Sequence, residues 1–199
     1  MKNVRIVLAG LVCCVIAACA TEQKLEGIPL VWKPKDTMAS MGVVPTSALS
    51  QQSITVAPFE DHRPKPNLIG ENRENTLPLS VTTSDSVPAF VSRKMKDLLS
   101  QSGLNIVDSG GRLVLHGEVV SFFVTEINTY VGDVRIKLSL RTPQDRVIWE
   151  GIAGGSAEHF GRSYRDENYY ETLSHSMINL VGNLLRDPGF QKAVAASAR

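Results

Sequence analysis

The sequence has little cysteine and almost no net charge, and each shortage excludes a class of protein. Only three of the 199 residues are cysteine, and two of them, Cys13 and Cys14, lie in an apolar stretch near the N-terminus. A fold stabilised by several disulfides and a cysteine zinc site are therefore both excluded. With 21 basic and 20 acidic residues, the formal charge of +1 gives no electrostatic support for binding nucleic acid.

The sequence motifs of common enzymes are also missing. There is no phosphate-binding loop that ends in Lys-Ser or Lys-Thr, and there is no G-x-S-x-G nucleophile motif. The glycines at 151, 154 and 155 fall in an expected strand, where they favour a bend or close packing of the sheet. None of the four histidines has a partner at a metal-binding spacing; they are His62, His116, His159 and His175. We therefore expect no enzymatic activity, no cofactor and no metal.

The apolar run needed for a transmembrane helix is missing too, and a shorter signal stands in its place. Lys2 and Arg5 precede an apolar stretch over 6–16, which is shorter than the ~20 residues needed to cross a bilayer. Small residues then come directly before Cys19, as in the lipobox of bacterial lipoproteins. We predict that 1–18 is a cleaved signal peptide and that Cys19 is lipidated, with palmitate among its acyl chains. A retained membrane helix and a cytosolic core helix are the disfavoured alternatives.

Lipidation would also fix the compartment. After cleavage the mature chain has one cysteine, which the lipid occupies, so the domain relies on its own apolar core. Ala20 follows Cys19, and the absence of Asp at this position favours the outer membrane. We therefore expect a protein anchored in the outer-membrane lipid bilayer through acylated Cys19, with its domain facing the periplasm.

The remaining chain divides into a tether and a single domain. Residues 19–50 have no sustained periodicity and contain three prolines, which indicates a tether. Within it, residues 28–32 are either a short edge strand packed on the domain, which we favour, or an apolar docking spot. Residues 51–199 are long enough for one domain with one core.

Hydrophobic periodicity predicts the elements of this domain. Alternating apolar residues predict strands at 53–58, 68–71, 104–107, 113–125, 130–142 and 147–156, with a bulge near 119–120 and a loop over 72–83. Apolar residues at helical spacing predict helices at 87–103, 166–186 and 190–197. The order strand, helix, strand, three-stranded meander, helix is typical of an α+β fold, in which two helices pack on one face of a mostly antiparallel sheet.

Two clusters of side chains are candidate binding sites. Asp61 and Arg63 lie in a polar loop after the first strand, where they form either a partner-binding loop or, as we favour, a local ion pair that orders the turn. Tyr164, Tyr169 and Tyr170 lie around the start of the last long helix, where they form a contact patch or cap the core.

Several segments resemble the YajG-type family of bacterial lipoproteins. The resemblance rests on 54–63 with its Asp61-x-Arg63 motif, 69–70, 87–103, 130–140, 148–152 and 184–190. It implies an outer-membrane location and a fold, but no catalytic residue. The order of elements is also similar to the amino-terminal domain of TolB and to LpoB-type lipoproteins, which is an analogy of fold alone.

These observations predict a non-enzymatic interaction module of the cell envelope. Its partner would be an envelope protein or the cell wall, a homo-oligomer stays open, and nucleic acid is not expected. The alternatives are an accessory lipoprotein of an envelope transport or flagellar assembly and, less favoured, a hydrolase.

Overall fold

The computed structural model describes residues 24–35, 37 and 49–196. The predicted signal peptide, the predicted lipidation site Cys19 and part of the predicted tether lie outside these residues. Within the described part of the chain, no helix has both the length and the apolar character that crossing a membrane requires.

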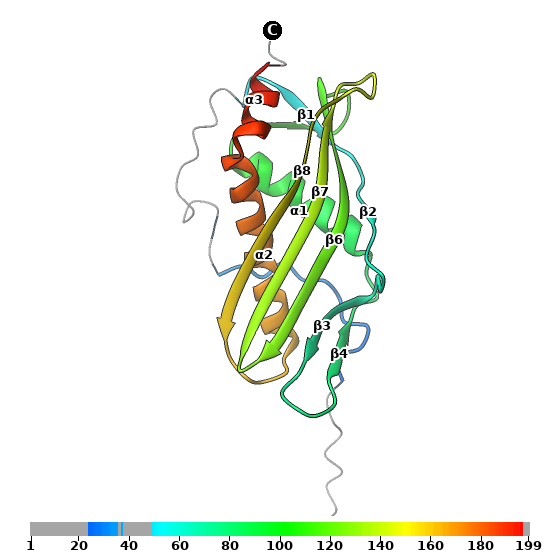
Figure 1. Cartoon of the computed structure of the whole chain (residues 1–199), viewed down its shortest axis with the longest axis vertical. Coiled ribbons are helices and arrows are strands. Elements are labelled where there is room, and N and C mark those ends of the chain that lie inside the picture. Colours follow the sequence, from blue (N-terminus) through cyan, green and yellow to red (C-terminus); the bar gives the residue numbers. More distant parts are fainter. Residues whose placement is uncertain (1–23, 36, 38–48, 197–199) are drawn as a thin grey trace, which may run out of the picture.

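A long antiparallel meander forms the centre of the fold (Figure 1). Its strands are β6 (Leu113–Ile127), β7 (Thr129–Arg141) and β8 (Val147–Phe160). Side chains alternate between a buried and a more accessible face, because successive residues of a strand point to opposite sides. In β6 the alternation changes where its pairing with β7 skips Val120, which confirms the predicted bulge.

The other edge of β6 carries a succession of short strands. β1 (Ser53–Val56), β2 (Glu60–Asp61) and β3 (Leu68–Asn72) pair with it in parallel, one after another along its length. β5 (Asn105–Val107) pairs with β1 in parallel, and β4 (Leu79–Thr82) pairs with β3 in antiparallel fashion. The described sheet is therefore mixed, but its three long strands make most of the pairing antiparallel, as predicted.

The prediction of a loop over 72–83 was wrong, because β4 lies within it. This strand pairs with β3 and buries the side chain of Val81. A strand of four residues with one buried apolar side chain is too short to show a period of two in the sequence. Its formation depends on the neighbouring strand, and this context is not visible in local propensity.

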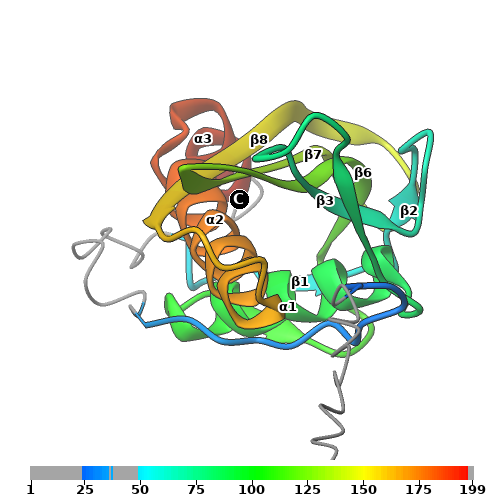
Figure 2. The ribbon, with the colours of Figure 1, turned by 90° about the horizontal axis from the view of Figure 1, so that it is seen from below.

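Two long helices lie on one side of the sheet, as predicted (Figure 2). α1 (Val87–Gln101) begins after Ser86, whose hydroxyl accepts a hydrogen bond from the amide of Ala89 at 3.4 Å. α2 (Asp166–Arg186) has the bounds that periodicity predicted. The predicted apolar stripe of α1 is buried, and its members are Val87, Val91, Met95, Leu98 and Leu99.

A short helix closes the described chain beside α2. It is α3 (Pro188–Ala196), and it buries Phe190 completely. The ring of Phe190 meets Trp149 of β8 edge-on, with ring centroids 5.2 Å apart. Trp149 therefore points toward the core.

α2 crosses β8 in direct backbone contact at Gly155. A Cβ atom at this position would lie 2.2 Å from both the amide nitrogen of Leu180 and the carbonyl oxygen of Ser176. Asn179 and Asn183 of the same helix donate side-chain hydrogen bonds to β8 carbonyl oxygens, at 2.7 and 2.9 Å. These contacts occupy backbone acceptors of a strand at the edge of the sheet.

Part of the segment predicted as a tether is packed on the domain. Leu25 is only 3% exposed, and Ile28 forms a parallel bridge with Thr83. Further along, the amide of Lys33 donates to the hydroxyl of Ser174 on α2 at 3.0 Å. Residues 24–35 are thus part of the fold, in agreement with the edge-packing alternative for 28–32.

Candidate functional site

Asp61 and Arg63 form a local ion pair at the end of β2. The Arg63 guanidinium lies 2.7 Å (Nη2) and 2.8 Å (Nε) from the two carboxylate oxygens of Asp61. It also donates to the carbonyl oxygens of Leu68, at 3.2 Å, and of Pro66. Because Arg63 is only 8% exposed, these contacts order the loop after β2 from within, as the local-pair alternative predicted. A partner-binding role for the loop stays a prediction.

The protonation of Asp61 follows from this environment. Burial is the largest single influence and would raise the pKa of its carboxyl group. The hydrogen bonds and the positive charge of Arg63 together outweigh burial and hold the pKa below its ordinary value of 3.8. Asp61 is therefore ionised at neutral pH and acts as the counter-charge of Arg63.

A row of charged side chains crosses the sheet next to this pair. It consists of Glu60, His62, Glu118, Lys137 and Glu150, and we call it the charged row. His62 lies 3.4 Å from Glu60 and 3.2 Å from Glu118, measured from nitrogen to carboxylate oxygen. Lys137 bridges Glu118 and Glu150 at 3.5 Å each. Within the row, three carboxylates face one permanent cation, and the neighbouring Arg141 is paired with Asp145. The row therefore has an excess of negative charge.

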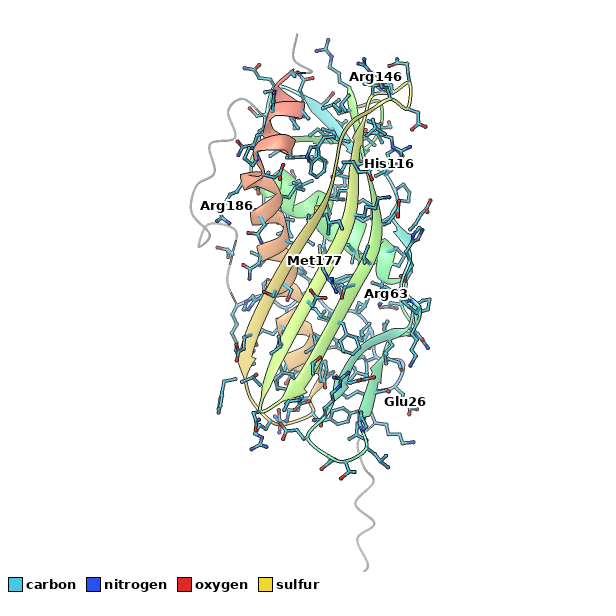
Figure 3. The ribbon with its side chains drawn as sticks, in the orientation of Figure 1. Glu26, Arg63, His116, Arg146, Met177 and Arg186 are labelled. Carbon is cyan, nitrogen blue, oxygen red and sulfur yellow. The ribbon has the colours of Figure 1, made fainter. Side chains whose placement is uncertain are left out.

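The charged row lies on the accessible face of the meander, which we call the open face. This face presents the side chains of Glu118, Ser121, Asp133, Arg135, Lys137, Glu150 and Ile152, and no helix of the described residues covers it. Figure 3 shows the open face toward the viewer, with His116 on β6, Arg63 at its edge and Met177 of α2 behind the sheet.

Lys137 is held in its charged form. The negative charges of Glu118 and then Glu150 raise the pKa of its ammonium group above the ordinary value of 10.5. A lysine acts as a nucleophile or general base only when its pKa is lowered toward neutrality. The arrangement therefore suits ion pairing rather than catalysis by this lysine.

Two hollows accompany the charged row. A cleft of about 150 Å³ is lined in part by the row, through Glu60, Glu118, Lys137 and Glu150, and also by His116, Ser139 and Arg141. This is below the ~300 Å³ of typical small-molecule pockets. The second hollow is an open, mostly apolar groove of about 340 Å³, which lies between the loop after β2 and the β6 residues Val120 and Phe123. The cleft is too small to enclose a typical small molecule and the larger groove is open to solvent, so the open face is better suited to contact with a surface.

The three tyrosines cap the core instead of forming an exposed patch. Tyr169 is fully buried, and its hydroxyl donates to a carboxylate oxygen of Glu126 at 2.9 Å. The other carboxylate oxygen accepts from the amide of Tyr164 at 3.0 Å. Burial and the charge of Glu126 raise the pKa of Tyr169, so its hydroxyl stays a donor. Tyr170 is buried as well.

The histidines lie in separate places. His62 and His116 are on or beside the charged row, whereas His159 lies 3.3 Å from Glu171. His175 accepts a hydrogen bond from the amide of Lys35 at 3.0 Å and so holds the N-terminal segment on α2. Over 24–35, 37 and 49–196, no three His, Cys, Asp or Glu side chains are grouped in a way that could hold a metal ion.

The charged row was not predicted from the sequence. Its members come from β6, β7, β8 and the end of β2, and only the register brings them together: Glu118 is opposite Lys137, and Glu60 is beside Glu118. The usable signal was the opposite charges at alternating positions of the predicted strands. Cys19, the other predicted site, lies outside the described residues.

Neither a family model nor a curated protein sequence matches the chain. Solved structures do match. A Xanthomonas campestris protein of the DUF330 family model has a TM-score of 0.53 at 13% identity over 72% of this chain and 88% of its own. An uncharacterised protein has a TM-score of 0.50 at 11% identity, with coverage of 82% and 98%.

A third similar structure comes from Caulobacter crescentus and is provisionally named a lipoprotein. Its TM-score is 0.44 at 12% identity, and the match covers 81% of this chain and 97% of that chain. The structural matches to the first two proteins show that they share the α+β fold of this chain. At identities this low, a shared fold says nothing about function. Membership of the YajG-type family stays a prediction.

Proposed function

We propose that this protein is a lipoprotein anchored through Cys19 in the outer membrane, where its domain serves as a non-enzymatic interaction module in the periplasm. The anchor is supported by the basic, apolar and small-residue pattern that ends at Cys19. The described fold begins at Lys24, close behind that cysteine.

The observation that carries the interaction role is the open face with its charged row. Long antiparallel sheets usually bury one face and leave the other in water, where its side chains are free to bind. The excess of carboxylates in the row favours a partner that presents lysine or arginine side chains. We therefore favour an envelope protein over the cell wall as the partner.

In-cell photo-crosslinking of the full lipidated chain tests this role. A photoreactive residue replaces Arg135 on the open face, and the control replaces Arg93, which is exposed on α1 on the other side of the sheet. We expect one defined envelope protein to be captured from position 135 and not from position 93. Equal capture from both positions, or capture from neither, would contradict the proposal.

Two further variants test the charged row and the lipid anchor separately. Glu118→Gln with Glu150→Gln removes two charges of the row and is expected to reduce capture at position 135 several-fold. Cys19→Ser is expected to release the chain from the membrane fraction. The identity of the captured protein also separates a general adaptor from an accessory subunit of a transport or flagellar assembly.

A further inference from the structure

Three loops and the entry of the chain meet at one end of the molecule, the lower end in Figure 1. The loop after β3 reaches the β6–β7 turn, because the amide of Asn128 donates to the carboxylate of Glu74. The same carboxylate accepts from Arg162 in the β8–α2 loop, with Nε 3.1 Å from Oε2. Leu25 enters at this end, where its amide donates to Tyr164 Oη at 3.3 Å and its carbonyl accepts from Thr82 at 2.9 Å.

Exposed apolar side chains gather at the same end. The apolar tip, as we call it, consists of Leu77, Ile127, Val131 and Phe160. Leu77 and Phe160 are 78% and 82% exposed, and the other two are about half exposed. Thr129 pairs with both Ile127 and Phe160, so these two side chains flank it in one row across the strand ends. Isolated exposed apolar residues are ordinary, but a group made of one loop residue and three residues near the ends of adjoining strands marks a contact surface.

The segment between Cys19 and Lys24 is short enough to keep this end of the domain near a lipid anchor on Cys19. Only four residues lie between Cys19 and Lys24, so five steps of the backbone join their Cα atoms. At roughly 3.5 Å per residue, the Cα atom of Lys24 cannot lie more than about 18 Å from that of Cys19. An acyl anchor on Cys19 therefore holds the apolar tip within reach of the bilayer interface.

We propose that the apolar tip inserts into the headgroup region of the membrane that holds the anchor, so that the domain stands on the bilayer rather than hanging on a long tether. The inference rests on the lipid anchor of the proposed function. Three cationic groups at this end are in ion pairs, Lys24 with Glu26, Arg73 with Glu71, and Arg162 with Glu74. Beyond the hydrogen bond from Lys33, the exposed Arg165 lies close enough to Glu167 to lower the pKa of that carboxyl group further. The contact is therefore apolar, and anionic lipid adds little to it.

The same orientation sets the distance between the charged row and the membrane. Phe160 lies ten positions after Glu150 along β8. At about 3.3 Å per residue this is about 33 Å along the strand. A domain that stands on its apolar tip thus holds the charged row well clear of the bilayer, where an envelope protein can reach it.

The test places single fluorescent probes on the lipidated chain in zwitterionic lipid vesicles. Cysteines replace Leu77, Ile127 or Phe160 and carry an environment-sensitive dye; Ile152→Cys and Val147→Cys, further along the open face and at the opposite end, are the controls. Labelling is selective because acylation occupies the thiol of Cys19. We expect blue-shifted emission and quenching by lipids with a headgroup-depth quencher at the three tip positions only, with little dependence on salt.

Vesicle flotation of the same samples tests the lipid anchor separately from the orientation of the domain. If the chain floats and the tip probes stay as water-exposed as the controls, the standing orientation is wrong and the anchor is retained. If the tip probes shift without vesicles in a concentration-dependent way, the tip contacts a second copy and the inference is overturned. If the acylated chain does not float, the proposed anchor fails, and the inference fails with it.

Discussion

Arg63 is a charged side chain that the fold buries, and Asp61 supplies its counter-charge. The pair is separated by one residue in the sequence, with side-chain exposures of 6% and 14%. The neighbouring pair of Glu71 and Arg73 has the same spacing, but its arginine is half exposed. The two pairs therefore allow a direct comparison of a buried and an exposed ion pair.

We expect Asp61→Asn to destabilise the domain by about 3 kcal/mol, because it leaves the buried guanidinium without a counter-charge. The control Glu71→Gln is expected to cost about 0.5 kcal/mol, since water solvates Arg73 when the partner charge is lost. Urea unfolding of the mature chain measures both values. Equal losses of unfolding free energy would show that burial does not strengthen the contribution of the Arg63 ion pair to stability.

The same pair predicts that the stability of the domain depends on pH. The pKa of Asp61 in the folded chain lies below its ordinary value of 3.8. The unfolded state therefore binds the proton first, and the stability contributed by Asp61 is present above about pH 4 and lost as the pH falls through the folded pKa. The difference in unfolding free energy between the natural chain and Asp61→Asn is expected to be constant near neutral pH and to narrow below about pH 4. A difference that widens on acidification would contradict this assignment.

Some pairings of side chains could be predicted from the sequence and others could not. Asp61 and Arg63 are two positions apart, so a local pair follows from their spacing. Glu118 and Lys137 meet only through the register of β6 and β7, and that register includes a bulged residue. A shift of one residue would move Lys137 to the other face of the sheet.

The packing of α2 against β8 leaves no space for a side chain at position 155. Gly155→Ala would place a methyl group against backbone atoms of α2, which cannot move aside as a flexible side chain can. We expect a destabilisation of about 3 kcal/mol, at the upper end for an overpacked core.

The next glycine along the strand is the matched control. A Cβ at position 154 would be 3.4 Å from Arg135 Cγ, an ordinary contact. Gly154→Ala is therefore expected to change the free energy of unfolding by less than about 1 kcal/mol, or to raise it slightly. Thermal unfolding of the two variants compares them, and equal melting temperatures would refute close packing at Gly155.

The long elements were predictable because each has a period of its own. Alternation over more than ten residues predicted β6 and β7, a shorter pattern over 147–156 predicted most of β8, and an apolar stripe predicted each of α1 and α2. β2 and β4 have two and four residues, and they form because β6 and β3 offer them partners. These two strands follow from tertiary contacts rather than from their own sequence.

At the scale of the molecule, the N-terminal segment belongs to the domain that it precedes. The side chain of Leu25 is buried beside β4, whereas Leu77 is exposed in the loop before that strand. Leu25→Ala is expected to cost about 2 kcal/mol and to release residues 24–35, so that trypsin cleaves faster at Lys33 and Lys35. Leu77→Ala is the control and should change the unfolding free energy by less than about 0.5 kcal/mol. Unchanged proteolysis of Leu25→Ala would show that the segment is held by its other contacts.

The periodic elements, the α+β class and the signal pattern that ends at Cys19 can all be read from local stretches of the sequence. These depend on the geometry of one stretch of backbone, which repeats every 3.6 residues in a helix and every two in a strand. The tertiary structure decided the strands β2 and β4, the packing of residues 24–35, the charged row and the apolar tip. Each of these joins segments far apart in the chain, and their meeting depends on strand register and helix packing, which no single segment encodes.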